Sequence, residues 1–238
     1  METIKSEKLD FTVTELTEQH KREMEKHANF SQGTIATHYN EICTNYEDIY
    51  LRVGFHDPRK CADHVIANQC QFPDLAVGDA EVLDLGCGTG LVGQYLHEAG
   101  YRNIIGVDAS KGMLEECENK RPEVHSGLVE LFLGSPDTFP ADLRDRFDFV
   151  TASGILADNH LDCSVFEEML LALKTGGVCV FATRTEYLEK YGYGDYMQKL
   201  TDEGRWKLLT NETFGRYDNQ TNGQIGRFTP TEAQVFAY

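Results

Sequence analysis

The sequence EVLDLGCGTG, residues 81–90, joins an apolar run to a glycine-rich turn. The apolar run ends at Leu85, and the glycines after it allow positive φ and let backbone N–H groups approach a ligand without a Cβ in the way. The helix expected after the turn points its N-terminus at the same place. Eighteen residues after Gly90, a second apolar run ends in Asp108, whose carboxylate can accept both hydroxyls of a ribose. The stretch therefore predicts a nucleoside site at a strand-to-helix turn.

The glycine spacing alone does not identify the nucleoside. The dinucleotide fingerprint GxGxxG fails when counted from Gly86 but fits Gly88, Gly90 and Gly93, a register that starts two residues after the turn begins. Asp84 distinguishes the possible ligands better than the glycine spacing does. A carboxylate beside the turn would repel a pyrophosphate but attract an ammonium or sulfonium group. S-adenosylmethionine carries both groups. The pattern therefore favours S-adenosylmethionine over NAD.

Strands and helices alternate around this turn. The apolar runs predict strands at residues 81–85, 103–108, 129–133, 147–152 and 177–183, separated by helices at 90–99, 111–120 and 164–173. Such an alternation implies parallel pairing, right-handed crossovers and helices on both faces. A further helix at 195–203 precedes strand-like stretches at 206–217 and 233–238, which predict an antiparallel pair joined through the Gly- and Asn-rich segment 222–226. We expect an α/β, Rossmann-like doubly wound, mostly parallel seven-stranded sheet.

The N-terminal part has a different pattern. From Ile35 to Tyr50, apolar residues recur at the spacing of one helix face, and a second helix is expected between Pro58 and Pro73. Residues 1–30 are charged and poor in aliphatic side chains, which fits a solvated helix and a frayed tail equally. We therefore expect a helical cap over residues 1–70 and one α/β domain over residues 71–238.

The composition narrows the partners. The chain has 238 residues and a formal net charge of −17, which makes nucleic acid and anionic membrane unlikely partners, and no basic run offsets that charge. No run of about 18 apolar residues is long enough to span a membrane. The seven cysteines form no CxxC pair, and no secretory segment opens the chain, so we expect a cytoplasmic protein with free thiols. The histidines lack the spacing of metal ligands, and we predict no metal.

Two segments resemble a known family. The sequences EVLDLGCGTG at 81–90 and IIGVDAS at 104–110 resemble motifs I and II of the class I S-adenosylmethionine-dependent methyltransferases, and the resemblance extends over about residues 35–238. Residues 39–47, 106–115 and 174–178 are similar more narrowly to the Williams–Beuren-region methyltransferase-like proteins. The resemblance implies S-adenosylmethionine as cofactor and methyl transfer to an O, N or S nucleophile. The absence of a recognition domain and of a basic groove favours a small-molecule substrate; the alternatives are a protein side chain and a catalytically silent cofactor-binding partner protein.

The resemblance also implies cofactor contacts in the glycine turn and after the second strand. In the turn, we read Cys87 as a small filling residue rather than a nucleophile. Residues just after the second strand would lie near the adenine. These expected contacts are Asp84, Gly86, Cys87, Gly88, Gly90, Asp108, Ala109, Ser110 and Met113.

Further contacts are implied at the ends of later strands. Gly134 and Ser135 would flank the adenine, where the family often has an Asp or Glu; this chain has neither there, and Asp137 is the substitute. Ser153 and Gly154 would line the methionine side. Tyr46 on the N-terminal helix either closes over the cofactor or packs in the core.

No catalytic base is evident from the sequence. His160 follows the fourth strand and is our candidate base, with an ordinary surface-loop histidine as the alternative. Residues 151–156 do not contain the Asn/Asp-Pro-Pro-aromatic tetrapeptide, which would be a resemblance to the amino-nitrogen methyltransferases of DNA and RNA. The oligomeric state is open.

Overall fold

The computed structural model describes residues 22, 32–218 and 232–238. The predictions for residues 1–30 and for the linking segment 222–226 lie outside the described residues, Arg22 apart. None of the described helices is long and apolar enough to cross a bilayer.

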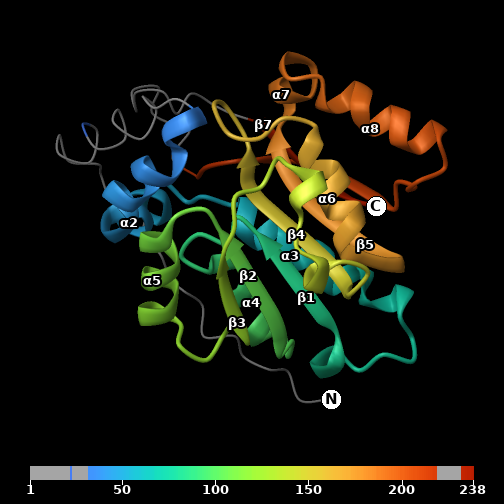
Figure 1. Cartoon of the computed structure of the whole chain (residues 1–238), viewed down its shortest axis with the longest axis horizontal. Coiled ribbons are helices and arrows are strands. Elements are labelled where there is room, and N and C mark those ends of the chain that lie inside the picture. The colour runs from blue at the N-terminus through green and yellow to red at the C-terminus, as the bar shows by residue number, and fades with distance from the viewer. Residues whose placement is uncertain (1–21, 23–31, 219–231) are drawn as a thin grey trace.

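One seven-stranded sheet organises the chain, with strand order β3-β2-β1-β4-β5-β7-β6 (Figure 1). Strands β1 to β5 pair in parallel, whereas β7 is antiparallel to both β5 and β6. This confirms the predicted doubly wound, mostly parallel α/β sheet and its terminal antiparallel pair. The strands are β1 (Glu81–Leu85), β2 (Asn103–Asp108), β3 (Gly127–Glu130), β4 (Phe147–Leu156), β5 (Leu173–Arg184), β6 (Thr210–Gly215) and β7 (Glu232–Ala237).

Helices cover both faces of the sheet, and the central strands β1, β4 and β5 bury side chains on both sides. On one face, α3 and α4 share a core with Val82, Phe149 and Val180. On the other, α6 and α8 pack with Phe147, Phe181 and Trp206. The helices are α2 (Ile35–Arg52), α3 (Asp57–Asn68), α4 (Leu91–Glu98), α5 (Lys111–Lys120), α6 (Ser164–Ala172), α7 (Thr185–Lys190) and α8 (Tyr193–Asp202).

Several predicted boundaries are wrong. The third strand ends at Glu130 rather than residue 133, because pairing with β2 stops where β2 itself ends at Asp108. Two short 3-10 turns, Pro136–Thr138 and Ala141–Leu143, then lead to β4. Strands β4 and β5 are longer than expected, and α7 was not anticipated.

The two helices of the predicted cap have different positions. The buried face of α3, with Cys61, Ala62 and Val65, packs on the sheet. Only α2 lies beside the carboxyl ends of the parallel strands, where it contacts α5 (Figure 1). The division into a cap at 1–70 and a domain at 71–238 stays a prediction.

Candidate functional site

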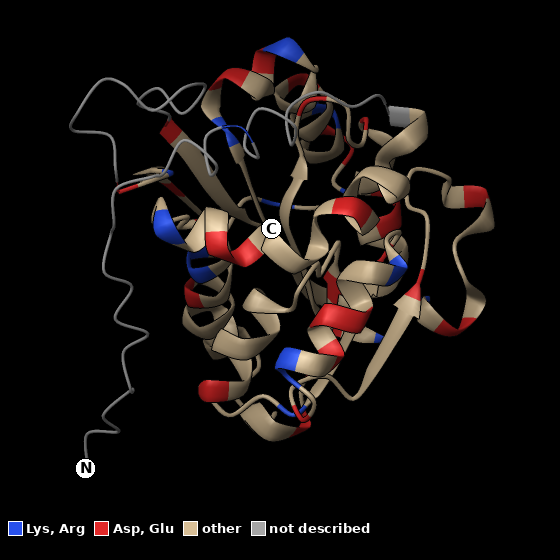
Figure 2. Ribbon diagram, turned by 90° about the vertical axis from the view of Figure 1, so that its left-hand side faces the viewer, with Lys and Arg blue, Asp and Glu red and all other residues tan. Residues whose placement is uncertain are grey.

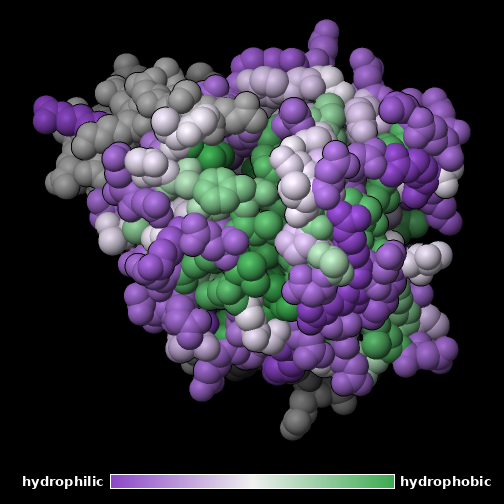
Figure 3. Space-filling view, viewed as in Figure 1, coloured by the Kyte–Doolittle hydropathy of each residue, from purple (hydrophilic) through white to green (hydrophobic). Residues whose placement is uncertain are grey.

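An open cleft, whose empty space including the open solvent at its mouth is about 720 Å³, lies at the carboxyl edge of the sheet, beside β1 and β4, where the strand order reverses. Doubly wound sheets bind ligands at this switch point. Apolar side chains gather in the middle of the molecule's face above the sheet, surrounded by hydrophilic ones (Figure 3). The cleft is lined by residues 35, 36, 39, 46, 86, 88, 108–110, 113, 131–133, 153–155, 160 and 161.

The glycine turn forms one wall of the cleft. Gly86 has φ 65°, and a Cβ there would lie 2.1 Å from Cγ2 of Ile155. Gly88 has φ 54°, and a Cβ there would meet nothing within 4 Å. The first glycine is therefore required by the neighbouring strand, and the second leaves its space open to a ligand.

Asp108 ends β2 and lies at the cleft with its carboxylate fixed. Its two oxygens accept backbone N–H groups from Gly88 at 2.9 Å and Ser110 at 2.8 Å. Burial raises the pKa of Asp108 to about 6 although these bonds oppose the shift. Carboxylate oxygens have further lone pairs, so the group remains able to accept hydroxyls.

Asp84 lies in β1, before the glycine turn. It is fully buried and does not line the cleft. Its Oδ1 accepts the Thr151 hydroxyl at 2.7 Å, whereas its Oδ2 has no hydrogen-bond partner within the described part of the chain. Burial raises the pKa of Asp84 to about 7. An unpartnered carboxylate oxygen beneath a glycine turn fits a positively charged ligand, because a cation would repay its desolvation.

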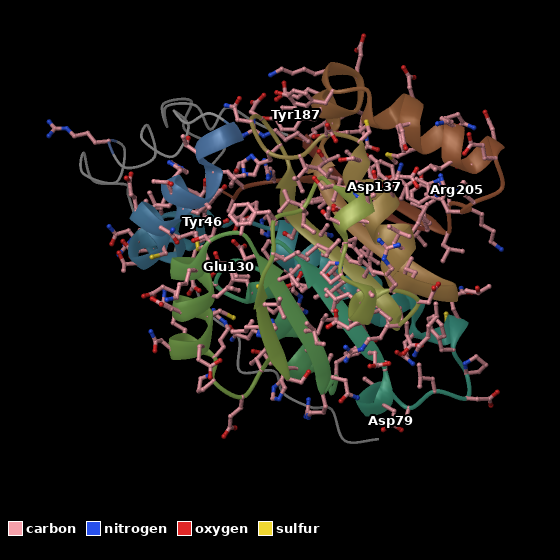
Figure 4. The ribbon with its side chains drawn as sticks, in the orientation of Figure 1. Tyr46, Asp79, Glu130, Asp137, Tyr187 and Arg205 are labelled. Carbon is pink, nitrogen blue, oxygen red and sulfur yellow. The ribbon has the colours of Figure 1, made fainter. Side chains whose placement is uncertain are left out.

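Helix α2 covers the cleft. Tyr39 and Tyr46 line it, and Tyr46 points from α2 toward the end of β3 at Glu130 (Figure 4). Tyr46 also packs beside the buried cluster of Ile42, Cys43 and Met113. Both readings of Tyr46, cleft and core, are thus consistent with its position.

Two polar contacts, which we did not predict, hold α2 in place. Asn40 Oδ1 accepts hydrogen bonds at 2.8 Å from both the Ser110 hydroxyl and the Gly112 N–H. Arg121 donates to Glu47 at 2.6 Å and to the carbonyl of Thr89, inside the glycine turn, at 2.9 Å. We call these contacts the Asn40 clamp and the Arg121 clamp. Sequence patterns carry no signal for them, since each joins residues 30 to 80 positions apart.

Some predicted contacts do not line the cleft. Cys87 is buried, and its Sγ would be 2.8 Å from a Cβ at Gly106, under the turn. Gly134 and Ser135 donate their N–H groups to Glu168 at 2.8 and 3.0 Å. Because β3 ends early, the wall at this point is residues 131–133 instead. Gly90 and Asp137 are also outside the lining.

The remaining predicted residues meet at the cleft. The structure brings together Tyr46, Gly86, Gly88, Asp108, Ala109, Ser110, Met113, Ser153, Gly154 and His160. Across the residues that the structure describes, no group of His, Cys, Asp and Glu has the arrangement of a metal site.

His160 faces the cleft from the loop after β4. Its Nδ1 lies 2.7 Å from the carbonyl oxygen of Asp158, which can only accept, so Nδ1 carries the proton. Its Nε2, 2.7 Å from the Tyr39 hydroxyl, is therefore the unprotonated nitrogen and accepts from that hydroxyl. Burial lowers the pKa of His160 to about 4. The ring is neutral at pH 7, with its basic nitrogen toward α2.

Helix α7 fixes this loop. The Asp158 carboxylate accepts the Tyr187 hydroxyl at 2.7 Å and the Lys190 ammonium at 2.6 Å, both from α7. Tyr187 lies at the top of the molecule, above the ends of the strands (Figure 4). The unpredicted helix thus orients the loop that carries the candidate base.

Comparison with known proteins gives the following matches. A family model described as a methyltransferase domain matches residues 82–177. Methyltransferase-like protein 27 of Homo sapiens is 32% identical over 174 residues, which are 72% of this chain and 67% of that protein. The ubiquinone biosynthesis O-methyltransferase of Psychrobacter arcticus is 21% identical over 168 residues, 68% of this chain and 65% of that protein. The crystal structure of magnesium protoporphyrin IX methyltransferase from Synechocystis PCC 6803 with bound S-adenosylmethionine is 14% identical, with a TM-score of 0.59 over 88% of this chain and 97% of that chain, a likeness of fold.

Proposed function

Since this chain belongs to the class I S-adenosylmethionine-dependent methyltransferases, we propose that it transfers the methyl group to an oxygen, nitrogen or sulfur atom of a small molecule. The observation that carries this proposal is one cleft that holds both the carboxylate at the end of β2, Asp108, and a basic nitrogen, His160 Nε2.

The described residues of the cleft fit the cofactor. Asp108 would accept the ribose hydroxyls. The open space at Gly88 would let the cofactor approach the backbone of the turn. Asp84 would offset the cofactor's positive charge from below the turn. For the adenine, residues 109–113 and the wall at 131–133 replace the expected pair Gly134 and Ser135. When bound, S-adenosylmethionine supplies an electrophilic methyl group on a sulfonium centre.

His160 is our proposed general base. Its Nδ1 is committed to the Asp158 carbonyl, so Nε2 is the nitrogen able to take the acceptor's proton. Because burial lowers the pKa of His160 to about 4, its ring is neutral at pH 7. Tyr187 and Lys190 act as positioning residues through Asp158.

The size and charge of the cleft support a small acceptor. Over the described part of the chain, Lys and Arg are scattered among the acidic residues on the face that shows α2 and α5, with no basic stripe for a nucleic acid (Figure 2). The ubiquinone biosynthesis O-methyltransferase that is similar to this chain carries the name of a small-molecule methyltransferase. The seven cysteines are all free, which supports our proposal of a cytoplasmic location.

The test is methyl transfer from labelled S-adenosylmethionine into a cell extract separated by size. We expect label in the small-molecule fraction, and loss of that label with His160→Ala. Asp137→Ala, an exposed change outside the cleft, is the matched control and should retain full transfer. Label confined to the protein fraction, or no label with a protein that binds the cofactor, would overturn the small-molecule proposal.

A further inference from the structure

A phenol of the chain itself lies against the proposed base. The Tyr39 hydroxyl is 2.7 Å from His160 Nε2, and burial raises the pKa of Tyr39, so the hydroxyl stays protonated and donates. We infer from this contact that the methyl acceptor is an uncharged aromatic hydroxyl compound, methylated on oxygen. The inference rests on the proposed function and names its substrate class.

The Tyr39–His160 contact shows what the base can receive. An aromatic hydroxyl reaches Nε2 at hydrogen-bond distance without displacing the Asp158 carbonyl from Nδ1. The two rings meet edge to face, with centroids 5.7 Å apart. The fold therefore already places one planar ring against this nitrogen, and an acceptor that arrives from the cleft would take the position of the Tyr39 hydroxyl.

Further aromatic side chains follow Tyr39, of which Tyr46 lines the cleft and Tyr50 and Phe55 lie behind it. Ring centroids are 6.2 Å apart for Tyr39 and Tyr46, 4.5 Å for Tyr46 and Tyr50, and 5.5 Å for Tyr50 and Phe55. Phe55 packs with Tyr50 in the cluster of Ile49, Val53 and Tyr217 behind the lining. Offset and edge-on contacts among rings are favourable, so Tyr39 and Tyr46, the two rings of α2 that line the cleft, suit a planar aromatic guest.

The charges of the lining point to a neutral acceptor. No Lys or Arg lines the cleft among the described residues, and Arg216, whose charge acts on Tyr39 and His160, is paired with Asp57, so a carboxylate or phosphate on the acceptor would find no counter-charge in the lining. Asp108 is the one carboxylate in the same lining, and the ribose would use it. A cationic amine therefore finds no free partner either. A neutral hydroxyl needs only an acceptor for its proton, which Nε2 provides.

The step balances with these groups alone. The acceptor oxygen forms a bond to the methyl carbon as the bond from that carbon to the sulfonium sulfur breaks, and the bonding pair stays on sulfur. The hydroxyl proton passes to His160 Nε2 and from there to solvent. The products are an aryl methyl ether and S-adenosylhomocysteine, and no oxidant or further reactant is required.

Four compounds with one ring system test the inference: naphthalene, 2-naphthol, 2-naphthylamine and 2-naphthoate. Calorimetry on the protein saturated with S-adenosylhomocysteine measures binding without turnover. A hydrogen bond to Nε2 should make 2-naphthol bind roughly two- to tenfold more tightly than naphthalene. The amine and the carboxylate should bind more weakly than 2-naphthol. With S-adenosylmethionine, mass spectrometry should detect 2-methoxynaphthalene.

Two variants separate the hydrogen bond from the fit of the ring. His160→Ala should reduce the ratio of naphthalene to 2-naphthol dissociation constants to about one, because only 2-naphthol uses the hydrogen bond to Nε2. Tyr39→Phe keeps the ring but removes the competing hydroxyl, so this ratio should rise above the wild-type value.

The outcomes keep the two proposals apart. A protein that does not bind S-adenosylmethionine, or that labels no small molecule, fails the proposed function. The inference alone is overturned if the protein labels small molecules but 2-naphthol binds no better than naphthalene. It is also overturned if 2-naphthol does not bind, or if the amine or the carboxylate binds more tightly.

Discussion

At the scale of single residues, Asp84 and Asp108 have different partners under the same turn. Asp108 holds two backbone N–H groups, whereas one oxygen of Asp84 has no partner in the part of the chain that the structure describes. Asp108 is therefore suited to position a ligand, and Asp84 to respond to the charge of that ligand. The two residues call for different experiments.

We expect Asp108→Ala to weaken binding of S-adenosylmethionine at least about tenfold. The change removes the acceptor for the ribose hydroxyls, roughly 1.5–3 kcal/mol for hydrogen bonds to a charged group. It also releases the N–H groups of Gly88 and Ser110, which loosens the turn. Calorimetry measures the loss, and circular dichroism checks the fold. An unchanged dissociation constant in the folded variant would refute the assignment.

Asp84 predicts a pH dependence of cofactor binding. Its pKa is raised to about 7 by burial, so part of the free protein carries a proton there at neutral pH. A cationic ligand favours the carboxylate, so binding should release protons and tighten as the pH rises from about 5.5 to 7. Calorimetry in buffers of different ionisation enthalpy counts the protons. Asp84→Asn should reduce the release to the part that Asp108, with its pKa of about 6, contributes.

The same raised pKa has a consequence for stability without ligand. A folded-state pKa above the unfolded value of about 3.9 means that the folded protein binds protons more tightly. The contribution of Asp84 is therefore fully present below pH 4 and is lost as the pH rises through about 7. The free energy of unfolding of Asp84→Asn should depend less on pH across this range. An identical pH slope in both proteins would contradict this account.

At the scale of elements, helix α2 is joined to the glycine turn through Arg121. The side chains of Arg121 and Glu47 are only 10% and 13% exposed, so their contact is protected from solvent. The Arg121 clamp therefore connects α2, which covers the cleft, with the glycine turn.

Glu47→Gln should accelerate release of the bound nucleoside about tenfold. The change removes a charge-assisted bond from the Arg121 clamp, worth about 1.5–3 kcal/mol, and lets α2 open more often. Asp48→Asn is the control on the next residue, since Asp48 pairs with Arg52 at the exposed side of α2. Stopped-flow displacement of S-adenosylhomocysteine measures the rate. An unchanged off-rate would make α2 a fixed wall rather than a lid.

At the scale of the whole molecule, the hydrophobic clusters on the two faces of the sheet both pack against its central strands. Phe166 is fully buried and its ring contacts those of Phe181, Tyr193 and Trp206. We therefore expect unfolding in urea to be a single transition. Fluorescence of Trp206, the one tryptophan of the chain, and far-UV circular dichroism should give the same midpoint.

Phe166→Ala should lower the free energy of unfolding by about 3–5 kcal/mol, because it opens a cavity between the sheet and α8. Leu208→Ala, at a side chain 48% exposed, should cost far less. A small effect of Phe166→Ala would mean that the sheet and its helices do not share a cooperative core.

The sequence predicts the sheet well because strand periodicity and turn glycines are local signals. The runs ending at Leu85 and Asp108 placed two strands and the turn between them. The end of β3 was wrong because pairing, not propensity, stops it at Glu130. Helix α7 and the Asn40 and Arg121 clamps depend on contacts between distant residues, which a single sequence does not encode in any recognisable spacing.

Arg121 has a thermodynamic consequence for a two-substrate reaction. The Arg121 guanidinium donates to both the Thr89 carbonyl in the turn and Glu47 on α2. Tyr39, on the same helix, contacts His160, the proposed base. A ligand that orders the turn should therefore also order α2. We expect binding of the nucleoside cofactor and binding of the methyl acceptor to affect each other. Linkage requires reciprocity: the factor by which nucleoside tightens acceptor binding must equal the factor by which acceptor tightens nucleoside binding. In Glu47→Gln both factors should fall together toward one, and calorimetry of each ligand in the presence of the other measures them.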